Sequence, residues 1–386
     1  MESLKIAFYT DTFLPAHDGV VTSIMNFRKE LMKRGHEVYI FASGNEKTKQ
    51  MIGDKKDIYI IKGMKFKKYP QYNLALMPFT SASKLNEISP DIVHAHTPFI
   101  MGTWALAMAK MNKFPIVSTF HTMFTEKSVI QEYASKHAVS FLQKYSWKYA
   151  RFYYNKCNAV MAPSYAIQAL LEKKGIPDSL VVPNAVDINR FNNKVHGGKI
   201  RKKLLKNRNE SLVLYVGRIS REKKIETLLK AAKNLHNEDI RFTFVGTGPA
   251  LNYYSKMSSR LGLNDKVSFE GFVDDKILPN YYASADLFCI PSTFETQGIV
   301  SIEAMASGKP VVGADSLALK EIIKNGKNGE KFVPNDSKSC AKKIKKVINN
   351  IDSYKETVQT AKKYSVEITT DELLKVYNRV INEVTV

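Results

Sequence analysis

Two carboxylates, Glu295 and Glu303, stand eight residues apart in the second half of the chain. Between them, Gly298 opens a segment of helical pattern, and the free N–H groups of a first helical turn can face an anion. The two acids can be a general acid and base, as in a hydrolase, or both can accept hydrogen bonds from hydroxyl groups. Basic neighbours favour the ionised form of both, which suits the second role. We therefore expect a site for a polyol that is also an anion, such as a nucleotide sugar, rather than an unrelated loop acid and helix acid.

A basic segment, Gly217 to Lys224, follows an apolar run of strand length. A fixed guanidinium with an ammonium nearby suits a diphosphate leaving group, whose negative charge grows as a glycosidic bond breaks. Taken alone, the segment fits an exposed basic turn before a helix equally well. We favour the diphosphate site because the expected fold places the loop of Glu295 and Glu303 beside this segment.

Three further loops carry candidate residues. Gly19 begins the first helix, where it can let a ligand approach the helix N-terminus, although simple turn chemistry explains it as well. His121 ends an expected strand, and a neutral imidazole there can hold a sugar hydroxyl or orient a carbonyl group. His94 and His96 alternate along one expected strand, so we predict that they point to opposite faces and are poor joint metal ligands. Because no acidic D-x-D cluster occurs in these loops, we predict no metal site and catalysis without a metal.

Apolar runs of strand length alternate with segments of helical period along most of the chain. The expected strands are 4–9, 37–42, 91–95, 116–120, 159–162, 180–182, 212–216, 241–245, 267–270, 287–290 and 310–313. The expected helices include 20–34, 222–236, 251–261, 276–284 and 370–383. This alternation is typical of the α/β class, with βαβ units, parallel sheets and helices on both faces.

The pattern restarts near residue 210, which predicts two Rossmann-like domains that face each other across a cleft. We assign residues 1–190 to the first domain and residues 200–367 to the second, with a C-terminal helix at 368–386 that crosses back onto the first. The length of 386 residues also favours two domains over one. Ligands of doubly wound sheets bind beyond the carboxyl ends of the strands, so we expect the site in the cleft.

The net charge of +21 favours anionic partners such as nucleic acid, phosphorylated substrates or acidic lipid headgroups. Residues 58–86 hold five lysines, among them Lys62, Lys65, Lys67 and Lys68, and no acid. Residues 133–171 hold five lysine or arginine residues and again no acid. A generally lysine-rich composition is the alternative, but these acid-free stretches favour a directed basic surface.

An expected helix at 133–154 places Lys144, Lys148 and Arg151 on one narrow stripe, with Trp147 beside it. The opposite, core-facing side is expected to hold Leu142, Tyr145, Tyr149 and Tyr153. A basic stripe edged by aromatic residues is typical of a helix that lies in a membrane interface. It also suits single-stranded nucleic acid, and a solvated helix with a broad core face remains a third interpretation.

Together these motifs resemble the family 4 retaining glycosyltransferases of the GT-B fold. The resemblance covers nearly the whole chain and rests on TDTFLP…DGV, DIVHAHTP, FHT, PNAVD at 183–187, GRISREK and the E-x7-E motif. Within that family the chain looks most like the diacylglycerol glucosyltransferases and related lipid-acceptor enzymes. The resemblance makes the first domain the acceptor-binding one and the second the donor-binding one.

The resemblance also implies roles for single residues. Arg218 and Lys223 would bind the donor diphosphate, Glu303 the ribose and Glu295 the transferred sugar, and His121 would sit at the sugar and acceptor side. Of these residues, the ones expected to take part in catalysis are Glu295, His121, Arg218 and Lys223, and no metal or other cofactor is expected. Backbone contacts to the donor are implied at Gly19, Gly217, Gly298, Ile299 and Val300.

Two positions depart from the family pattern. Lys224 stands where many members have glycine or asparagine, which leaves Lys224 as an alternative to Lys223 in phosphate binding. Ala185 stands where glycine is common, with no expected effect on chemistry. Retention without a protein nucleophile resembles front-side substitution, in which the leaving diphosphate takes the proton of the acceptor.

We therefore predict transfer of a hexose, with glucose and a UDP-sugar donor the first choices, to a membrane lipid such as diacylglycerol. We find no signal peptide and no membrane-spanning run, and three scattered cysteines fit a reducing cytosol, so we expect a cytoplasmic protein that docks on the inner face of the cell membrane. The alternatives are a soluble sugar, polysaccharide or cell-envelope glycan acceptor, a sugar-nucleotide 2-epimerase, and a basic nucleic-acid-binding protein. The last leaves Glu295 and Glu303 without a role, so no nucleic-acid partner is expected.

Overall fold

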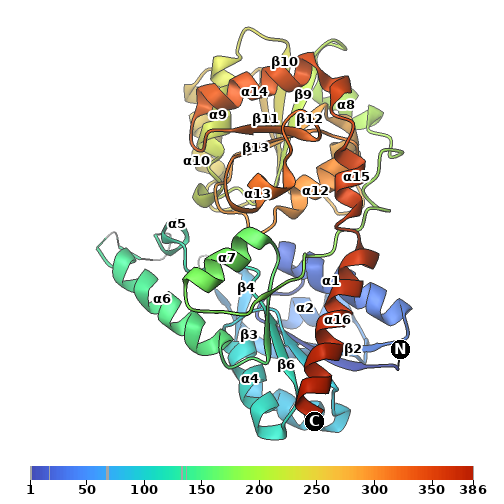
Figure 1. Ribbon diagram of the computed structural model, residues 1–386. Coiled ribbons are helices and arrows are strands. Elements are labelled where there is room, and N and C mark those ends of the chain that lie inside the picture. Colours follow the sequence, from blue (N-terminus) through green and yellow to red (C-terminus); the bar gives the residue numbers. More distant parts are fainter. Residues whose placement is uncertain (1, 17, 67–68, 132–133, 136, 386) are drawn as a thin grey trace. The chain divides into compact units, whose positions relative to one another are not determined.

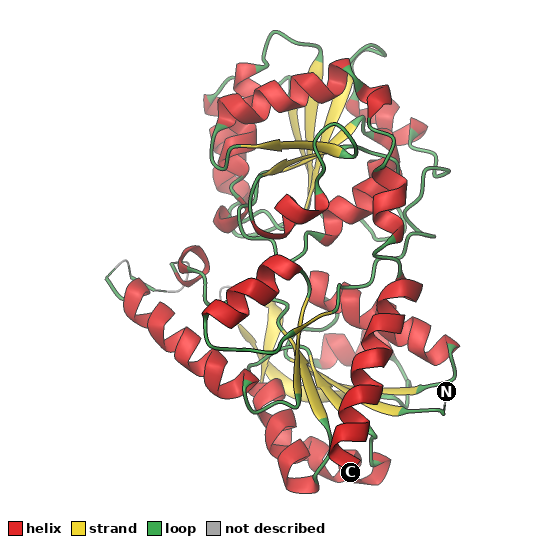
Figure 2. Cartoon of the chain, viewed as in Figure 1, coloured by secondary structure: helices red, strands yellow, loops and turns green. Residues whose placement is uncertain are grey.

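The computed structural model describes residues 2–16, 18–66, 69–131, 134–135 and 137–385 (Figure 1). The chain divides into two compact units, one formed by residues 1–185 with 366–386 and the other by residues 186–365. Each unit contains a largely parallel sheet with helices on both faces, as Figure 2 shows, which confirms the predicted fold class. No helix within the described ranges is both long and apolar enough to cross a membrane.

The described strands of the first unit form one sheet in the order β4-β3-β2-β1-β5-β6-β7-β8. Their bounds are β1 Lys5–Thr10, β2 Glu37–Gly44, β3 Ile58–Phe66, β4 Tyr69–Ala75, β5 Ile92–Ala95, β6 Ile116–Thr119, β7 Ala159–Ala162 and β8 Leu180–Val181. The sequence pattern missed β3 and β4, which pair antiparallel at one edge of an otherwise parallel sheet. In the sequence, β3 carries Lys62, Gly63 and Lys65 after its apolar start, and β4 carries Pro70 and Asn73. An edge hairpin does not need the continuous apolar run of a buried parallel strand.

The helices of the first unit cover the sheet because its central strands are apolar on both faces. Their bounds are α1 Gly19–Lys33, α2 Glu46–Ile52, η1 Pro78–Ser81, α3 Ala82–Ile88, α4 Ile100–Asn112, α5 Lys127–Ile130, α6 Val139–Tyr154, α7 Tyr165–Lys173 and α16 Val366–Thr385. In β1, Phe8 points into a core shared with α1 and α16, whereas Tyr9 points into a second core shared with α4 and α6. Burying each such side chain contributes on the order of 1.5–3 kcal/mol.

The C-terminal helix α16 belongs to the first unit, although the second unit precedes it in the chain. It packs beside α1, where Arg34 pairs with Asp371 and donates to the carbonyl oxygen of Glu367 at 2.9 Å. Its Tyr377 is fully buried against the sheet. The predicted return of the C-terminal helix to the first domain is confirmed, with a helix that begins at Val366 instead of Thr370.

Helix α6 is shorter than predicted and turns a different face inward. It begins at Val139, and the predicted residues 133 and 136 lie outside the described part of the chain. The prediction that Leu142 and Tyr145 face the core is wrong, because both side chains are exposed. Trp147 is buried instead, 7% exposed and stacked on Phe120, because its indole fills the space between α6 and the sheet.

The described strands of the second unit form a sheet in the order β11-β10-β9-β12-β13-β14, with every pair parallel. The strand bounds are β9 Ser211–Val216, β10 Ile240–Val245, β11 Val267–Gly271, β12 Leu287–Ile290, β13 Val311–Ala314 and β14 Gly329–Phe332. The helix bounds are α8 Gly198–Leu204, η2 Arg221–Lys223, α9 Ile225–Asn234, α10 Leu251–Arg260, α11 Leu278–Ser284, α12 Ile299–Ala306, α13 Leu317–Ile322, α14 Ser337–Asn349, η3 Ile351–Ser353 and α15 Thr357–Lys362. The predicted helix 222–236 is broken at Lys224, whose left-handed φ of 54° ends η2 before α9 begins.

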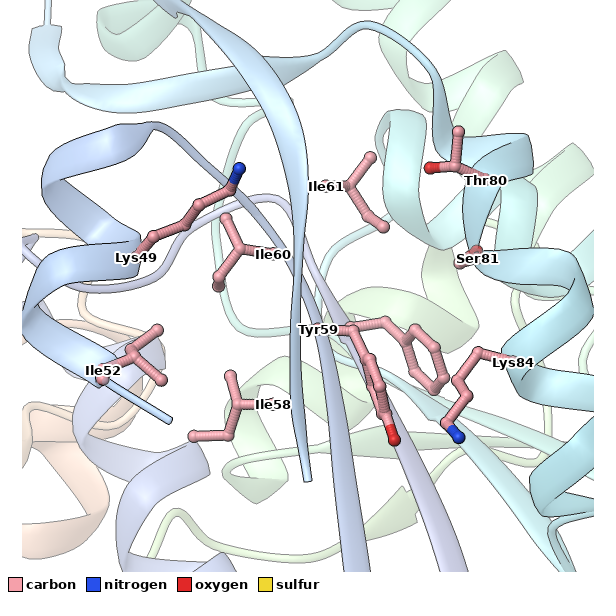
Figure 3. A pocket seen from close by; sticks show the side chains of 11 residues that line it. Lys49, Ile52, Ile58, Tyr59, Ile60, Ile61, Thr80, Ser81 and Lys84 are labelled. Carbon is pink, nitrogen blue, oxygen red and sulfur yellow. The ribbon is translucent and has the colours of Figure 1, made fainter. Parts of the chain in front are cut away.

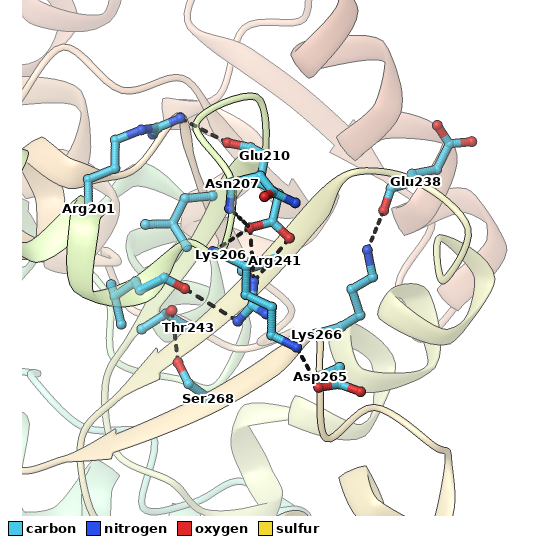
Figure 4. A network of polar contacts seen from close by, with 12 residues as sticks. Arg201, Lys206, Asn207, Glu210, Glu238, Arg241, Thr243, Asp265, Lys266 and Ser268 are labelled. Atoms are coloured by element: carbon cyan, nitrogen blue, oxygen red, sulfur yellow. Dashed lines mark hydrogen bonds and ion pairs between the residues drawn. The ribbon is translucent and has the colours of Figure 1, made fainter.

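A buried carboxylate fixes the entry into the second sheet (Figure 4). Glu210 is 5% exposed and accepts from the N–H groups of Lys206 and Asn207 at 2.7 and 3.1 Å and from the Arg241 guanidinium at 3.1 Å. Burial alone would raise the pKa of Glu210, but these N–H groups and Arg241 outweigh burial and lower the pKa below its usual value. The carboxylate therefore joins the segment before β9 to β10.

Replacing Glu210 with glutamine should reduce the free energy of unfolding by about 2 kcal/mol at neutral pH, because charge-assisted hydrogen bonds are lost. The pKa of Glu210 is lower in the folded than in the unfolded chain, so its stabilisation is present above the unfolded value and disappears as the pH falls through the folded value. Urea unfolding of both proteins at neutral pH and at about pH 3 measures this difference. Asp265→Asn is the control, since its exposed pair with Lys206 contributes little; equal losses in the two variants would contradict the prediction.

Candidate active site

The carboxyl ends of β9 and β12 meet in the second unit because the two strands pair in parallel. The loop after β9 carries Lys223, the loop after β12 carries Glu295, and the Lys223 Nζ lies 2.7 Å from the Glu295 Oε1. Both side chains are largely buried. The structure thus brings together two residues that the sequence placed in one site. Lys224, next to the end of η2, takes the left-handed conformation and is not the lysine paired with Glu295.

Two contacts hold the loop that carries Arg218, one from Tyr215 and one from the turn after β10. Tyr215 is buried beneath it and donates to the carbonyl oxygen of Arg218 at 3.0 Å. Burial raises the pKa of Tyr215, and the nearby carboxylates of Glu295 and Glu222 raise it further. A Cβ atom at Gly246 would lie only 2.0 Å from the carbonyl oxygen of Gly217, so the turn after β10 can pack on this loop only with glycine there. The turn after β10 therefore supports the Arg218 loop.

Helix α12 begins beside Glu295. Gly298 precedes it with a left-handed φ of 80°, where a Cβ atom would also approach a methyl group of Leu319 to 3.0 Å. The N–H groups of Ile299 and Val300 belong to the first turn and have no acceptor within the helix. The described site in the second unit thus combines a cation, a carboxylate and a helix N-terminus.

Glu303 lies on α12 and is only 7% exposed. Burial raises its pKa to about 7, although the Tyr282 hydroxyl, which donates to Oε2 at 2.7 Å, and the Arg190 guanidinium act to lower it. Arg190 thus favours the ionised form of Glu303, as expected of a basic neighbour, but desolvation exceeds the effect of this charge. Tyr282 was not predicted, because its position in α11 carries no distinguishing signal in the sequence.

In the first unit, Asp18 caps the helix that begins at Gly19. Its carboxylate accepts from the N–H groups of Val20 and Val21 at 3.0 Å each and from the Thr12 hydroxyl at 3.0 Å. Two of the first-turn donors that an anion would use are therefore already bonded to Asp18. The role of Gly19 in donor binding stays a prediction.

Three histidines form a buried stack at the carboxyl ends of β5 and β6. The rings of His94 and His96 lie 3.9 Å apart, and His96 Nδ1 lies 3.0 Å from His121 Nε2. The prediction that His94 and His96 point to opposite faces is wrong, because residues two apart along an extended chain point to the same face, where these two rings stack. His94 also contacts Thr119 and, on α16, the Tyr377 hydroxyl, at 2.8 and 2.7 Å.

Burial keeps these imidazoles neutral. It lowers the pKa of His121 to about 4, although the Asp18 carboxylate and a hydrogen bond with Asn184 act in the opposite direction. Burial likewise lowers the pKa of His94 and His96. A neutral imidazole at His121 agrees with the chemistry expected of it. Its partner Asn184, in the PNAVD motif, was not predicted.

Asp11 is a further buried acid at the same edge of the sheet. It accepts from the Thr97 hydroxyl at 2.6 Å and from the Met101 N–H at 2.9 Å, and so caps α4. Burial raises its pKa to about 6 against the effect of these hydrogen bonds. Asp11 thereby fixes the loop that carries His96 to the end of β1.

A pocket of about 410 Å³ between α2, β3 and α3 holds none of the predicted site residues (Figure 3). Its two ammonium groups belong to Lys49, which pairs with Glu46 at 3.0 Å, and to Lys84, which pairs with Glu87 and lies beside the ring of Tyr59. These lysines are already neutralised by neighbours on their own helices. We therefore assign the active site to the strand ends and not to this pocket.

The basic stripe of α6 is exposed at Lys144, Lys148 and Arg151. The prediction that Trp147 edges this surface is wrong, because the indole is buried in the core. Lys62 and Lys65 are exposed on β3, where their odd spacing sends them to opposite faces of the hairpin, and Lys67 and Lys68 lie outside the described residues. Helix α6 is thus the better-defined basic surface.

Within the described ranges, no three His, Cys, Asp or Glu side chains come together as a metal site. Catalysis without a metal stays a prediction, as does a cleft between the two domains.

The affinity for UDP, the core of the expected ligand, should fall as the pH drops through about 7, because protonated Glu303 no longer accepts from two hydroxyl groups. Tyr282→Phe removes a hydrogen bond that lowers this pKa, so the midpoint should move to higher pH. Calorimetric titration with UDP across this range measures both effects. Glu303→Gln is the control, because its side chain does not titrate and any remaining pH dependence comes from the nucleotide itself. Identical midpoints in the wild type and in Tyr282→Phe would refute the role of the Glu303 carboxylate in UDP binding.

Two family models match the chain. The model for Glycosyltransferase Family 4 matches residues 17–190, and the model for Glycosyl transferases group 1 matches residues 198–364. The two regions correspond to the sheets that carry the histidine stack and the Lys223–Glu295 pair, respectively.

Several characterised proteins are similar along most of their length. The alpha-monoglucosyldiacylglycerol synthase of Streptococcus pneumoniae (strain ATCC BAA-255 / R6) is 30% identical over 83% of this chain and 73% of that protein. A GDP-mannose-dependent alpha-mannosyltransferase of Corynebacterium glutamicum is 28% identical over 84% of this chain and 76% of that protein. The structure of Anabaena HepE in complex with UDP and glucose has the same fold, with a TM-score of 0.77 over 97% of this chain and 100% of that chain at 21% identity. The chain therefore belongs to the family 4 glycosyltransferases of the GT-B fold and is a hexosyltransferase.

Proposed function

We propose that this chain is a retaining glycosyltransferase that transfers glucose from UDP-glucose to a membrane lipid such as diacylglycerol. The observation that carries the proposal is the Lys223–Glu295 ion pair beside the start of α12. The Streptococcus relative, a glucosyldiacylglycerol synthase by name, supports this sugar and acceptor. The complex of HepE with UDP and glucose supports the nucleotide.

In the proposed donor complex, the diphosphate takes the place of Glu295 as the partner of the Lys223 ammonium. Glu295 then accepts a hydrogen bond from a hydroxyl of the transferred sugar. Arg218 supplies a second cation for the diphosphate, and the first-turn N–H groups of Ile299 and Val300 donate to phosphate or sugar oxygens. The ion pair thus keeps both side chains in position before the donor binds.

The ribose lies against Glu303 in this proposal. As a carboxylate, Glu303 accepts from the ribose hydroxyls, while the Tyr282 hydroxyl holds its Oε2. Because the pKa of Glu303 is about 7, binding of a hydroxyl pair favours the ionised form and lowers that pKa further.

Transfer proceeds on one face of the sugar. The bond between the anomeric carbon and the diphosphate oxygen breaks, the bond to the acceptor oxygen forms, and the acceptor proton passes to the leaving diphosphate. Arg218 and Lys223 stabilise the charge that grows on the diphosphate, and neutral His121 accepts from a hydroxyl at the acceptor side. Neither a protein nucleophile nor a metal takes part.

The acceptor reaches the first unit from an anionic leaflet on which α6 docks. Lys144, Lys148 and Arg151 are exposed on one stripe, with Phe141 and Phe152 exposed beside it. Each basic residue near an anionic surface contributes about 1 kcal/mol, enough for reversible attachment on the inner face of the cell membrane.

One competing donor has specific support. The Corynebacterium relative is a GDP-mannose-dependent enzyme by name and is nearly as similar to this chain. GDP-mannose, with a soluble sugar or glycan acceptor, is therefore the second candidate.

A screen of UDP- and GDP-sugars against diacylglycerol, lipid extracts and soluble sugars tests the proposal. We expect a glucosyl lipid with the anomeric configuration of the donor, formed at an unchanged rate in EDTA, as read by product mass and NMR. Products from soluble acceptors alone, or an inverted anomer, would reject it.

Lys223→Ala and Glu295→Ala should each lower turnover by at least about tenfold, roughly 1.4 kcal/mol of barrier, because each removes contacts to the reacting sugar diphosphate. Steady-state kinetics of product formation measure the loss. Lys224→Ala removes the adjacent positive charge and should keep most of the activity. If Lys224→Ala is instead the impaired variant, Lys224 is the phosphate-binding residue and our assignment of Lys223 fails.

Combined replacement of Lys144, Lys148 and Arg151 by glutamine should weaken binding to phosphatidylglycerol vesicles by about 100-fold at low salt, from about 1 kcal/mol per residue. Vesicle co-sedimentation measures the affinity, and turnover on a soluble acceptor analogue reports any general damage. The matched control replaces three exposed lysines of the second unit, Lys230, Lys338 and Lys342, with glutamine. Equal losses in both triple variants would mean that net charge, and not α6, drives docking.

A further inference from the structure

An apolar groove with a volume of about 500 Å³ lies on the surface of the first unit along α4. Its lining comes from α4, from η1 and from α6, all in the first unit, where α4 and α6 are labelled in Figure 1. The side chains that line it include Pro78, Ile100, Thr103, Trp104, Ala107 and Tyr149. No residue assigned to the donor or to the basic stripe is among them.

The polar atoms of these walls are bonded to one another. The Trp104 Nε1 donates to the Ser81 hydroxyl at 3.0 Å, and the Thr103 and Tyr149 hydroxyls lie 2.8 Å apart. Tyr149 also donates to the carbonyl oxygen of Pro98. Because these groups are satisfied within the walls, the groove offers a ligand mainly hydrocarbon and aromatic surface. A polar ligand would have to break these bonds, whereas an apolar one would not.

The groove starts at the edge of the sheet that carries the histidine stack. Phe99 and Ile100 line its mouth and begin α4, only a few residues after His96. Asp11 holds this N-terminus through the N–H of Met101. A molecule with its polar end beside His96 and His121 can therefore extend an apolar tail along α4.

The surroundings match the surface of an anionic bilayer. Met77 and Phe79, which flank Pro78, are 41% and 57% exposed, and Met111 near the far end of α4 is 76% exposed. Neither α4 nor residues 58–86 contain an acid, and α6 contributes the exposed bases of the stripe. Exposed apolar side chains beside an acid-free, basic surface favour a lipid over an acidic or polar partner.

We propose that this groove holds one acyl chain of the acceptor lipid and so directs the hydroxyl of its headgroup to the His121 edge. The inference rests on the proposed function, since it names the subsite for the tail of that acceptor. Affinity should rise roughly fourfold for each methylene that enters the groove, until the groove is full.

The fluorescence of Trp104 can report lipid binding in the groove without any enzymatic turnover. The chain has two tryptophans, and Trp147 is buried in the core, so a brominated short-chain diacylglycerol in the groove should quench Trp104 selectively. We expect saturable quenching in the full-length protein below the aggregation concentration of the lipid, and its loss in Trp104→Phe. No quenching in the wild type, or equal quenching in Trp104→Phe, would overturn the proposal.

A matched pair of variants tests whether the acyl chain of the lipid lies in the groove. Ala107→Phe fills the groove from an exposed position on α4, and Met111→Phe adds the same ring one turn further along, outside the lining. We expect Ala107→Phe to weaken lipid binding and to raise KM for the lipid by at least about tenfold, while KM for the donor and the values for Met111→Phe stay near wild type. Unchanged lipid KM in Ala107→Phe would overturn the groove and leave the proposed function intact. Quenching without any lipid product would support the groove as an acyl site and reject the proposed function.

Discussion

The reversal of strand order in each sheet is the constraint on which the rest of this molecule depends. In the first unit the order runs outward from β1 in one direction and from β5 in the other, and in the second unit the same happens at β9 and β12. Adjacent strands whose following helices pass to opposite faces leave a crevice at their carboxyl ends. The Lys223–Glu295 pair lies at one such point, and Asp11 and His96 lie at the other. Topology alone therefore determines where polar side chains from distant parts of the sequence can meet.

Burial then sets the chemistry of the groups that meet there. At β5 and β6 it holds three imidazoles neutral, so that they can exchange hydrogen bonds without adding positive charge. In the second unit it brings the pKa of Glu303 to about 7, while Glu295 keeps a lysine partner. Two acids eight residues apart thus have different partners, a buried tyrosine hydroxyl for Glu303 and a lysine ammonium for Glu295.

Three features could be predicted from the sequence: the fold class, most strands, and the proximity of Lys223 to Glu295. Apolar runs of strand length indicate parallel strands, and the loops at their carboxyl ends indicate which side chains meet. The sequence did not reveal the β3–β4 hairpin, because lysines, a glycine and a proline interrupt the apolar residues of these two strands. The buried face of α6 was also mispredicted. Tyrosines and lysines are mixed around this helix, so the sequence does not show that Trp147 is buried by stacking on Phe120. Partners such as Tyr282 and Tyr377 come from remote segments and carry no local signal, and the PNAVD motif does not reveal that its Asn184 contacts His121.

Helix α16 has a consequence for how the chain is made. Its Tyr377 closes the core under the histidine stack, although β1 to β8 are synthesised long before it. The second unit, residues 186–365, stands in the chain between α16 and the rest of the first unit. The pair of Arg34 and Asp371, which fastens α16 to the end of α1, joins residues 337 positions apart in the sequence. The entropy of closing so long a loop is lost before such contacts contribute, so we expect the first core to close late in folding.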